Sequence, residues 1–212
     1  MLGLRLTIEF ALVAIILMVL IGLIAALMRL SRFFPLRWLG TIYVELFRST
    51  PLLVQLFFIV FGLPAIIPAV NDIFGQRTYP IIATALTLAV NEGAYVTEII
   101  RAGILGVDRG QKEAAASIGM TRFQTMRYII LPQAFKRMIP PLVNQAAQTI
   151  KDTSLLAPVG VVELLYKTQI VVNETFSSFK FYGVCAILYF IVIFAVSKTA
   201  SYLERRLQVD KR

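Results

Sequence analysis

The sequence predicts an all-α integral membrane protein, a single domain over residues 1–212 with five membrane-spanning helices. The composition is 58% hydrophobic with a mean hydropathy of +0.77, whereas a soluble domain has about 45–50% apolar residues. Polar or basic segments separate five apolar stretches, and each stretch comes close to the length of about 20 residues that a transmembrane helix needs. The predicted spans are residues 6–28, 52–70, 79–100, 139–164 and 181–203.

The first two spans are predicted from the way they begin. The stretch at residues 6–28 starts close to Met1, is too long for a signal peptide and is followed by no cleavage site, so we expect it to remain as a helix. The second span follows Thr50-Pro51. Thr50 is suited to cap a helix, and Pro51 suits a first helical position, where the backbone needs no N–H partner.

The remaining spans differ in polarity. Residues 139–164 form the least apolar of the five spans, and they contain Pro140-Pro141 and Pro158, which we expect to bend the helix. The last span, at residues 181–203, carries the single cysteine of the chain, Cys185. One cysteine excludes an internal disulfide, and Cys185 is expected to pack as a small residue.

The distribution of basic residues predicts the orientation in the membrane. Of the 21 Lys and Arg residues, 16 lie between the first two spans, between the third and fourth spans, or at the C-terminal end of the chain from Lys198 onward. Short segments rich in Lys and Arg stay in the cytoplasm, so we expect the N-terminus outside and the C-terminus inside. This asymmetry accounts for the formal charge of +9 without a nucleic-acid partner.

A polar segment at about residues 106–132 joins the third and fourth spans and is too polar to lie in lipid. We expect a short helix, a turn at Gly119 and a second short helix, held at the cytoplasmic surface. Small alanines would let another backbone approach closely, and Glu113 and Arg122 offer charges to a partner. The segment carries Glu113-Ala114-Ala115, then Gly119, then Ile129 and Leu131-Pro132.

This pattern resembles, position for position, the cytoplasmic signature loop of the permease subunits of bacterial ABC importers. Three further segments are similar to the polar-amino-acid subfamily of these permeases, and together the resemblance covers about residues 3–206. The family usually has a longer lead before the first span, so an interfacial helix there would be short or absent. The three segments are Glu45 to Gln55, Asn91 to Arg101, and Ile150 to Leu155.

The resemblance implies a multi-pass protein of the bacterial cytoplasmic membrane, surrounded by lipid, that works by alternating access. It implies two copies of a separate ABC ATPase subunit, a second permease subunit (a copy or a related chain) and an extracytoplasmic amino-acid-binding protein. ATP and Mg²⁺ would bind the ATPase, so this chain itself needs no cofactor. The residues expected to couple to the ATPase are Glu113, Ala114, Ala115, Gly119 and Arg122.

Two spans carry polar side chains at helical spacing, and such residues face a bundle interior or a water-filled path. At a rise of about 1.5 Å per residue, Glu92 lies roughly 13 Å from Arg101, and Gln148 roughly 16 Å from Arg137, near the middle of a core about 30 Å thick. The predicted substrate-binding residues are Asn91, Glu92, Tyr95 and Glu98 in the third span and Asn144, Gln148, Lys151 and Asp152 in the fourth.

Each of these residues also has a structural interpretation. Glu98 and Arg101 are three positions apart, and a structural ion pair is favoured there over substrate contact. Lys151 and Asp152 could equally neutralise other groups in the bundle. The amides of the fourth span could simply bond across helices. Arg48, before the second span, is expected to serve docking or structure and not to bind a ligand.

Charge in the spans favours a cationic guest. Carboxylates outnumber cations there, and an unpaired buried charge is costly, so a basic or neutral polar L-amino acid fits better than an acidic one. The alternative function is a secondary transporter or channel that uses the intramembrane carboxylates as an ion or proton relay. An enzyme is disfavoured, because the chain has no His, no phosphate-binding loop and no visible nucleophile–base pair. The particular amino acid stays open.

Overall fold

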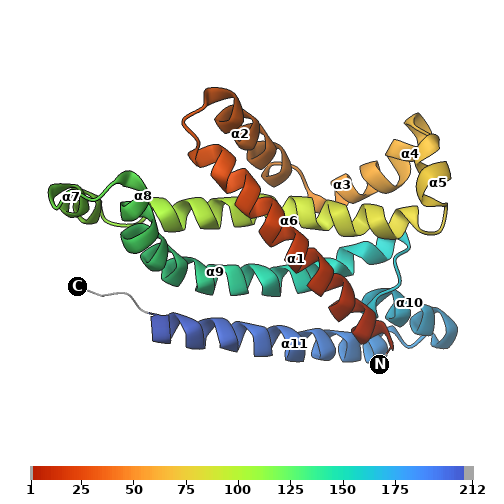
Figure 1. The fold of residues 1–212 in the computed structure, drawn as a ribbon. Helices are drawn as coiled ribbons and strands as arrows, with labels where there is room; N and C mark the ends of the chain where they lie inside the picture. The colour runs from red at the N-terminus through yellow and green to blue at the C-terminus, as the bar shows by residue number, and fades with distance from the viewer. Residues whose placement is uncertain (1, 208–212) are drawn as a thin grey trace.

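The computed structural model describes residues 2–207, and no strand occurs within that range (Figure 1). The basic residues Lys211 and Arg212, which contributed to the predicted orientation, lie outside it. The helices are α1 (Leu2–Leu30), α2 (Phe34–Arg48), α3 (Leu52–Phe57), α4 (Leu63–Ile66), α5 (Ala69–Phe74), α6 (Tyr79–Leu105), α7 (Arg109–Ser117), α8 (Arg122–Gln124), α9 (Leu131–Asp152), α10 (Leu164–Thr175) and α11 (Ser178–Leu207). Phe58–Gly62 and Thr125–Ile130 are π-helical, and Thr153–Val159 is a 3₁₀ helix.

The crossing of α1 and α6 forms the centre of the fold. Small residues let the two backbones approach, as is typical of helices packed in a membrane. A Cβ atom added to Gly22 would lie 2.7 Å from the Cβ of Val96 and 3.0 Å from the carbonyl oxygen of Gly93. Ala26 and Val96 are completely buried at the same contact. The position of α6, which carries one of the two polar stripes, is therefore set by close contact with α1.

Two helices, α1 and α11, are long and apolar enough to cross a membrane. Counting each bent pair of helices as one span raises the number to four: Phe34–Arg48 with Leu52–Ile66, bent by 101°, and Arg122–Val159 with Leu164–Thr175, bent by 48°. Helix α6 has 27 residues, or about 40 Å of helix, but its polar residues lower its mean hydropathy. The all-helical class is thus confirmed, and the count of five spans stays a prediction.

The two ends of the molecule differ in charge. In Figure 1, α7, α8 and the C-terminal end of α11 lie at one end, and the N-terminus, α5 and α10 lie at the other. The first end carries the basic segment between α6 and α9 and the basic residues Arg205 and Arg206. Two of the three segments that the charge count assigned to the cytoplasm therefore meet at one end of the fold, whereas α2, which follows the first span, lies apart from them (Figure 1).

The second predicted span, residues 52–70, begins at the predicted residue but ends early. The helix runs from Leu52 to Ile66 through a π-helical turn at Phe58–Gly62, and α5 follows from Ala69. The chain bends before this helix, at Pro51, and α2 precedes the bend where a loop was expected. Proline lacks the N–H that a helix interior uses and favours an extended preceding residue, which suits Pro51 to the break between α2 and α3. Thr50 does not cap α3. Pro51 holds the N-cap position, and the Thr50 hydroxyl donates backward to the Leu46 carbonyl at 2.8 Å.

The fourth predicted span, residues 139–164, also has different bounds. Helix α9 begins at Leu131 and ends at Asp152, and a 3₁₀ turn and a left-handed Gly160 follow (φ +85°). Pro140 and Pro141 lie inside α9. Lys151 and Asp152 are thus at the C-terminal end of a helix and not inside one.

Candidate functional site

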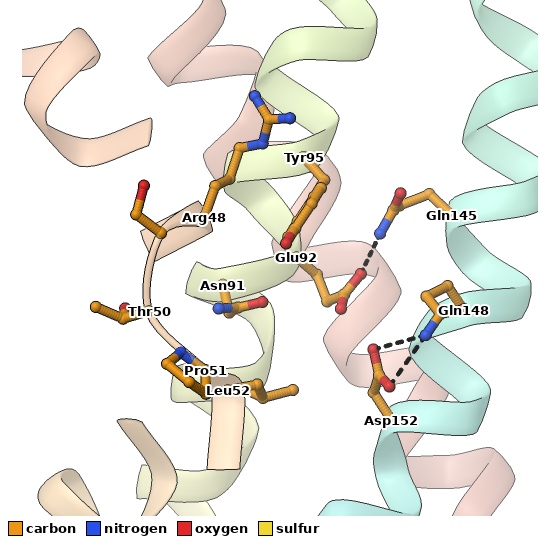
Figure 2. Close-up of a pocket in the computed structure, with 11 residues that line it drawn as sticks. Arg48, Thr50, Pro51, Leu52, Asn91, Glu92, Tyr95, Gln145, Gln148 and Asp152 are labelled. Atoms are coloured by element: carbon orange, nitrogen blue, oxygen red, sulfur yellow. Dashed lines mark hydrogen bonds between the residues drawn. The ribbon is translucent and has the colours of Figure 1, made fainter. Parts of the chain in front are cut away.

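A cavity of about 550 Å³ lies between the end of α2, the middle of α6 and the C-terminal half of α9 (Figure 2). Both polar stripes reach it, as the depth argument predicted for neighbouring helices. Five of the eight predicted substrate-binding residues line it: Asn91, Glu92, Tyr95, Gln148 and Asp152. The other lining residues are Arg48, Ser49, Thr50, Pro51, Leu52 and Gln145.

Glu92 is the most deeply placed charged group of the cavity. Its side chain is 2% exposed. It accepts a hydrogen bond from the Gln145 amide, and the Thr149 hydroxyl lies 3.3 Å from the same carboxylate oxygen. No Lys or Arg among residues 2–207 forms an ion pair with it. The site therefore holds a carboxylate that amide and hydroxyl donors solvate in part, without a protein counter-charge.

A second carboxylate faces the same space from α9. The Gln148 amide nitrogen lies 3.1 and 3.3 Å from the two carboxylate oxygens of Asp152, one turn further along the helix. In Figure 2 the side chains of Glu92 and Asp152 both point into the gap between α6 and α9. The wall that these two helices form is acidic.

The opposite wall is the segment Arg48–Leu52, between α2 and α3. The Arg48 guanidinium lies 5.2 Å from the centre of the Tyr95 ring, a cation–π contact. Arg48 is the only Lys or Arg that lines the cavity in the described part of the chain. Sequence reasoning missed it as a ligand candidate, since only the bend after α2 turns it toward α6.

Three predicted site residues lie elsewhere. Glu98 forms ion pairs with Arg29 of α1 and with Arg101, whose Nη2 is 2.8 Å from the carboxylate. The predicted ion pair between Glu98 and Arg101 is therefore present, and Glu98 does not line the cavity. Asn144 and Lys151 are exposed side chains of α9 that do not line the cavity.

A further buried carboxylate was missed altogether. Glu163 is 0% exposed and caps α10, accepting hydrogen bonds from the amides of Leu165 and Tyr166 at 2.8 and 2.7 Å. The Tyr189 hydroxyl of α11 donates to it at 2.6 Å. These three donors bond to it, and it does not line the cavity. An acid just after Gly160 and before an apolar run was the available signal for a cap.

The predicted coupling segment has part of the predicted local structure. Helix α7 is capped by Asp108, which accepts from the Gly110 amide at 2.6 Å, and Gly119 follows in a left-handed turn (φ +79°). A capping box between Thr121 and Gln124 starts α8. The short first helix and the glycine turn are as predicted, but the second helix is not short, because α8 continues without a break through Thr125–Ile130 into α9.

The side chains of this segment are largely free on its outer face. Glu113, Ala114 and Arg122 are exposed, whereas Ala115 packs inward at 3% exposure. Ile118 and Phe123 are 78% and 71% exposed beside them. Large apolar side chains next to charges, exposed at one end of a molecule, are typical of a protein–protein contact.

Comparison with known proteins decides what kind of protein this is. Residues 18–209 match the model of a family described as binding-protein-dependent transport system inner membrane component. The chain belongs to this family. The permease therefore resides in the inner membrane. Its membership in this family supports the function of an importer permease over that of a secondary transporter or channel.

Similar proteins extend over nearly the whole chain. The permease is 37% identical over 189 residues to the glutamine transport system permease protein GlnP of Escherichia coli K12, covering 89% of this chain and 84% of the relative. It is 40% identical over 206 residues to the L-cystine transport system permease protein TcyB of Bacillus subtilis, covering 97% and 85%. A crystal structure described as an amino acid ABC transporter with histidines shares 39% identity and a TM-score of 0.87, covering 96% of this chain and 92% of that one.

Proposed function

We propose that this chain is the membrane-spanning permease of an ATP-driven importer of polar L-amino acids, basic or neutral, and that it is not itself an enzyme. The observation that carries the proposal is the cavity between α2, α6 and α9, with two carboxylates on one wall and one guanidinium on the other. The names of the similar permeases, which refer to glutamine and cystine, support an amino-acid substrate.

The arrangement of charge fits a zwitterion in one orientation. Glu92 and Asp152 would receive the α-ammonium group, since neither has a cationic partner among residues 2–207. The planar guanidinium of Arg48 matches the geometry of an α-carboxylate. A basic side chain would add a second attraction to the acidic wall, and an acidic side chain would be repelled. Asn144, Lys151 and Glu98, predicted as ligands, have no such part in this proposal.

Energy would come from other subunits. The proposed assembly contains two ATPase subunits, which bind ATP and Mg²⁺, a second permease subunit and an extracytoplasmic binding protein. Glu113, Ala114, Ala115, Gly119 and Arg122 would dock on the ATPase through the exposed face of α7 and α8. ATP binding would then favour the outward-open state by differential affinity for the two conformations. We include in this proposal that the chain crosses the membrane five times.

Binding of labelled amino acids to the permease–ATPase complex in lipid tests the substrate site. We expect a basic amino acid to bind, and Glu92→Gln to weaken its binding by at least about tenfold, a change of about 1.4 kcal/mol. Glu174→Gln is the matched control, because Glu174 is an exposed acid of α10 away from the cavity. If no amino acid binds the wild-type complex, recognition belongs to the external binding protein and the cavity is only a passage.

A further inference from the structure

The bend between α2 and α3 frees backbone groups that need partners. A helix end leaves its last carbonyl groups without intrahelical donors, and lipid offers no water to replace them. The chain turns by 101° between α2 and α3. The turn lies beside Asn91 and Glu92 of α6, at the cavity (Figure 2). Those of its carbonyl groups that do not face the cavity therefore need donors from the protein.

Two amide side chains supply most of the donors. The Gln55 amide nitrogen lies 3.1 Å from the carbonyl oxygens of Phe47 and Thr50, and 2.6 Å from the Thr50 hydroxyl. The Asn91 amide donates to the Phe47 carbonyl at 3.0 Å and to the Gln55 side-chain oxygen at 3.1 Å. The Thr50 hydroxyl itself donates to the Leu46 carbonyl. Side chains thus donate to three carbonyls around the bend, those of Leu46, Phe47 and Thr50.

These bonds join two different segments of the chain, and each of the two resembles the corresponding segment of the amino-acid permeases. Gln55 and Thr50 come from the stretch around the bend, and Asn91 comes from α6, 36 positions after Gln55. Asn91 is 4% exposed, and both hydrogens of its amide are directed at the bend. Its donor groups are therefore engaged with the protein and not with the cavity.

We propose that Asn91 and Gln55 form a clasp that positions the segment Arg48–Leu52 as a wall of the substrate cavity. Asn91 and Gln55 are positioning residues, and they act on the substrate through that wall. The segment Arg48–Leu52 contributes five of the residues that line the cavity. The clasp sets where the Arg48 guanidinium stands relative to Tyr95 and Glu92. This consequence for the substrate rests on the proposed function, whereas the clasp itself does not.

Hydrogen–deuterium exchange on the permease–ATPase complex in lipid nanodiscs tests the clasp directly. The variants are Asn91→Leu and Gln55→Met, which keep approximate size and remove the amides. We expect the backbone amides of residues 46–56 to exchange about tenfold faster in each variant, the effect of losing about 1.4 kcal/mol. Asn173→Leu, on the exposed face of α10, should leave this exchange unchanged. Unchanged exchange in both clasp variants overturns the proposal.

Uptake in proteoliposomes with the binding protein tests the consequence. Each variant should raise the KM for amino-acid uptake about tenfold with a maximal rate within about twofold of wild type, because a displaced wall weakens binding before it slows turnover. The double variant should be no worse than the worse single variant, since the two amides act as one unit. Additive effects would contradict the clasp. A wild-type complex that takes up no amino acid, with fast exchange in the variants, would refute the proposed function and leave the clasp standing.

If the Asn91→Leu complex fails to assemble, the exchange of the Gln55→Met variant alone tests the clasp. Gln55 is only half-buried, so we expect its replacement to disturb the packing less. Faster exchange at residues 46–56 in that variant supports the clasp, and wild-type exchange refutes it.

Discussion

The cavity and the coupling segment use hydrogen bonds in opposite ways. Around the cavity, polar side chains from α2, α3, α6 and α9 bond across elements, as Asn91 does with Gln55 and Gln145 with Glu92. In α7 and α8 most bonds join residues within one turn, as between Thr121 and Gln124, and a long bond, from the Gln133 amide of α9 to Gln111, leaves the segment. The cavity therefore depends mainly on how several helices pack, and the coupling segment depends mainly on bonds between neighbouring residues.

The largest expected effect comes from separating α1 and α6. In Gly22→Leu the new Cβ would lie 2.7 Å from the Cβ of Val96 and 3.0 Å from a backbone oxygen of α6. Overpacking of this kind costs about 1–3 kcal/mol or more, and here the backbone itself has to move. We expect most of the folded protein to be lost, measured as the yield of monodisperse protein and its Tm. Gly183→Leu has open space around it and should behave as wild type. Equal yields of both variants would contradict the central role of this crossing.

A smaller loss of stability is expected at Glu98, where a structural role and a substrate-binding role lead to different expected results. Glu98→Gln leaves Arg29 and Arg101 without their carboxylate partner, and truncating one member of a partly desolvated pair destabilises by up to about 3 kcal/mol. We expect a lower Tm of the complex and an unchanged KM for the amino acid. A raised KM at unchanged Tm would return Glu98 to the substrate site.

The smallest effect on stability, and a specific effect on function, is expected in the coupling segment. Glu113 is exposed on α7 and bonds to no other element through its side chain within residues 2–207. Glu113→Ala should leave Tm within experimental error, since surface substitutions change stability by less than about 0.5 kcal/mol. It should increase the ATP hydrolysed per amino acid transported. Normal coupling in this variant would remove the proposed role of Glu113, and Lys198→Ala near the end of α11 is the control.

Comparison of the two regions explains what could be predicted. Gly119 and the helices on either side of it were predicted because a left-handed glycine and helix caps are written in a few adjacent residues. The polar stripe of α6 was predicted because helical spacing alone places Asn91, Glu92 and Tyr95 on neighbouring faces. Both signals are local in the chain.

The features that the sequence did not indicate were all non-local. Asn144 has helical spacing like that of Gln148, but the rotation of α9 against its neighbours keeps it out of the cavity lining. Arg48 was assigned to docking or structure, although the 101° bend brings it over Tyr95. Glu163 was overlooked among the acids, although α10 and α11 enclose it.

The sequence by itself determined the all-helical membrane class, and the resemblance of its short motifs indicated the permease family, because hydropathy and short motifs are recorded over a turn or a single helix. Only the tertiary structure decided which polar side chains share one cavity. That choice depends on the bend after α2, and the bend is held by an amide pair 36 positions apart. Side-chain contact across such a separation depends on how the helices pack against one another. The periodicity within one helix does not contain that information.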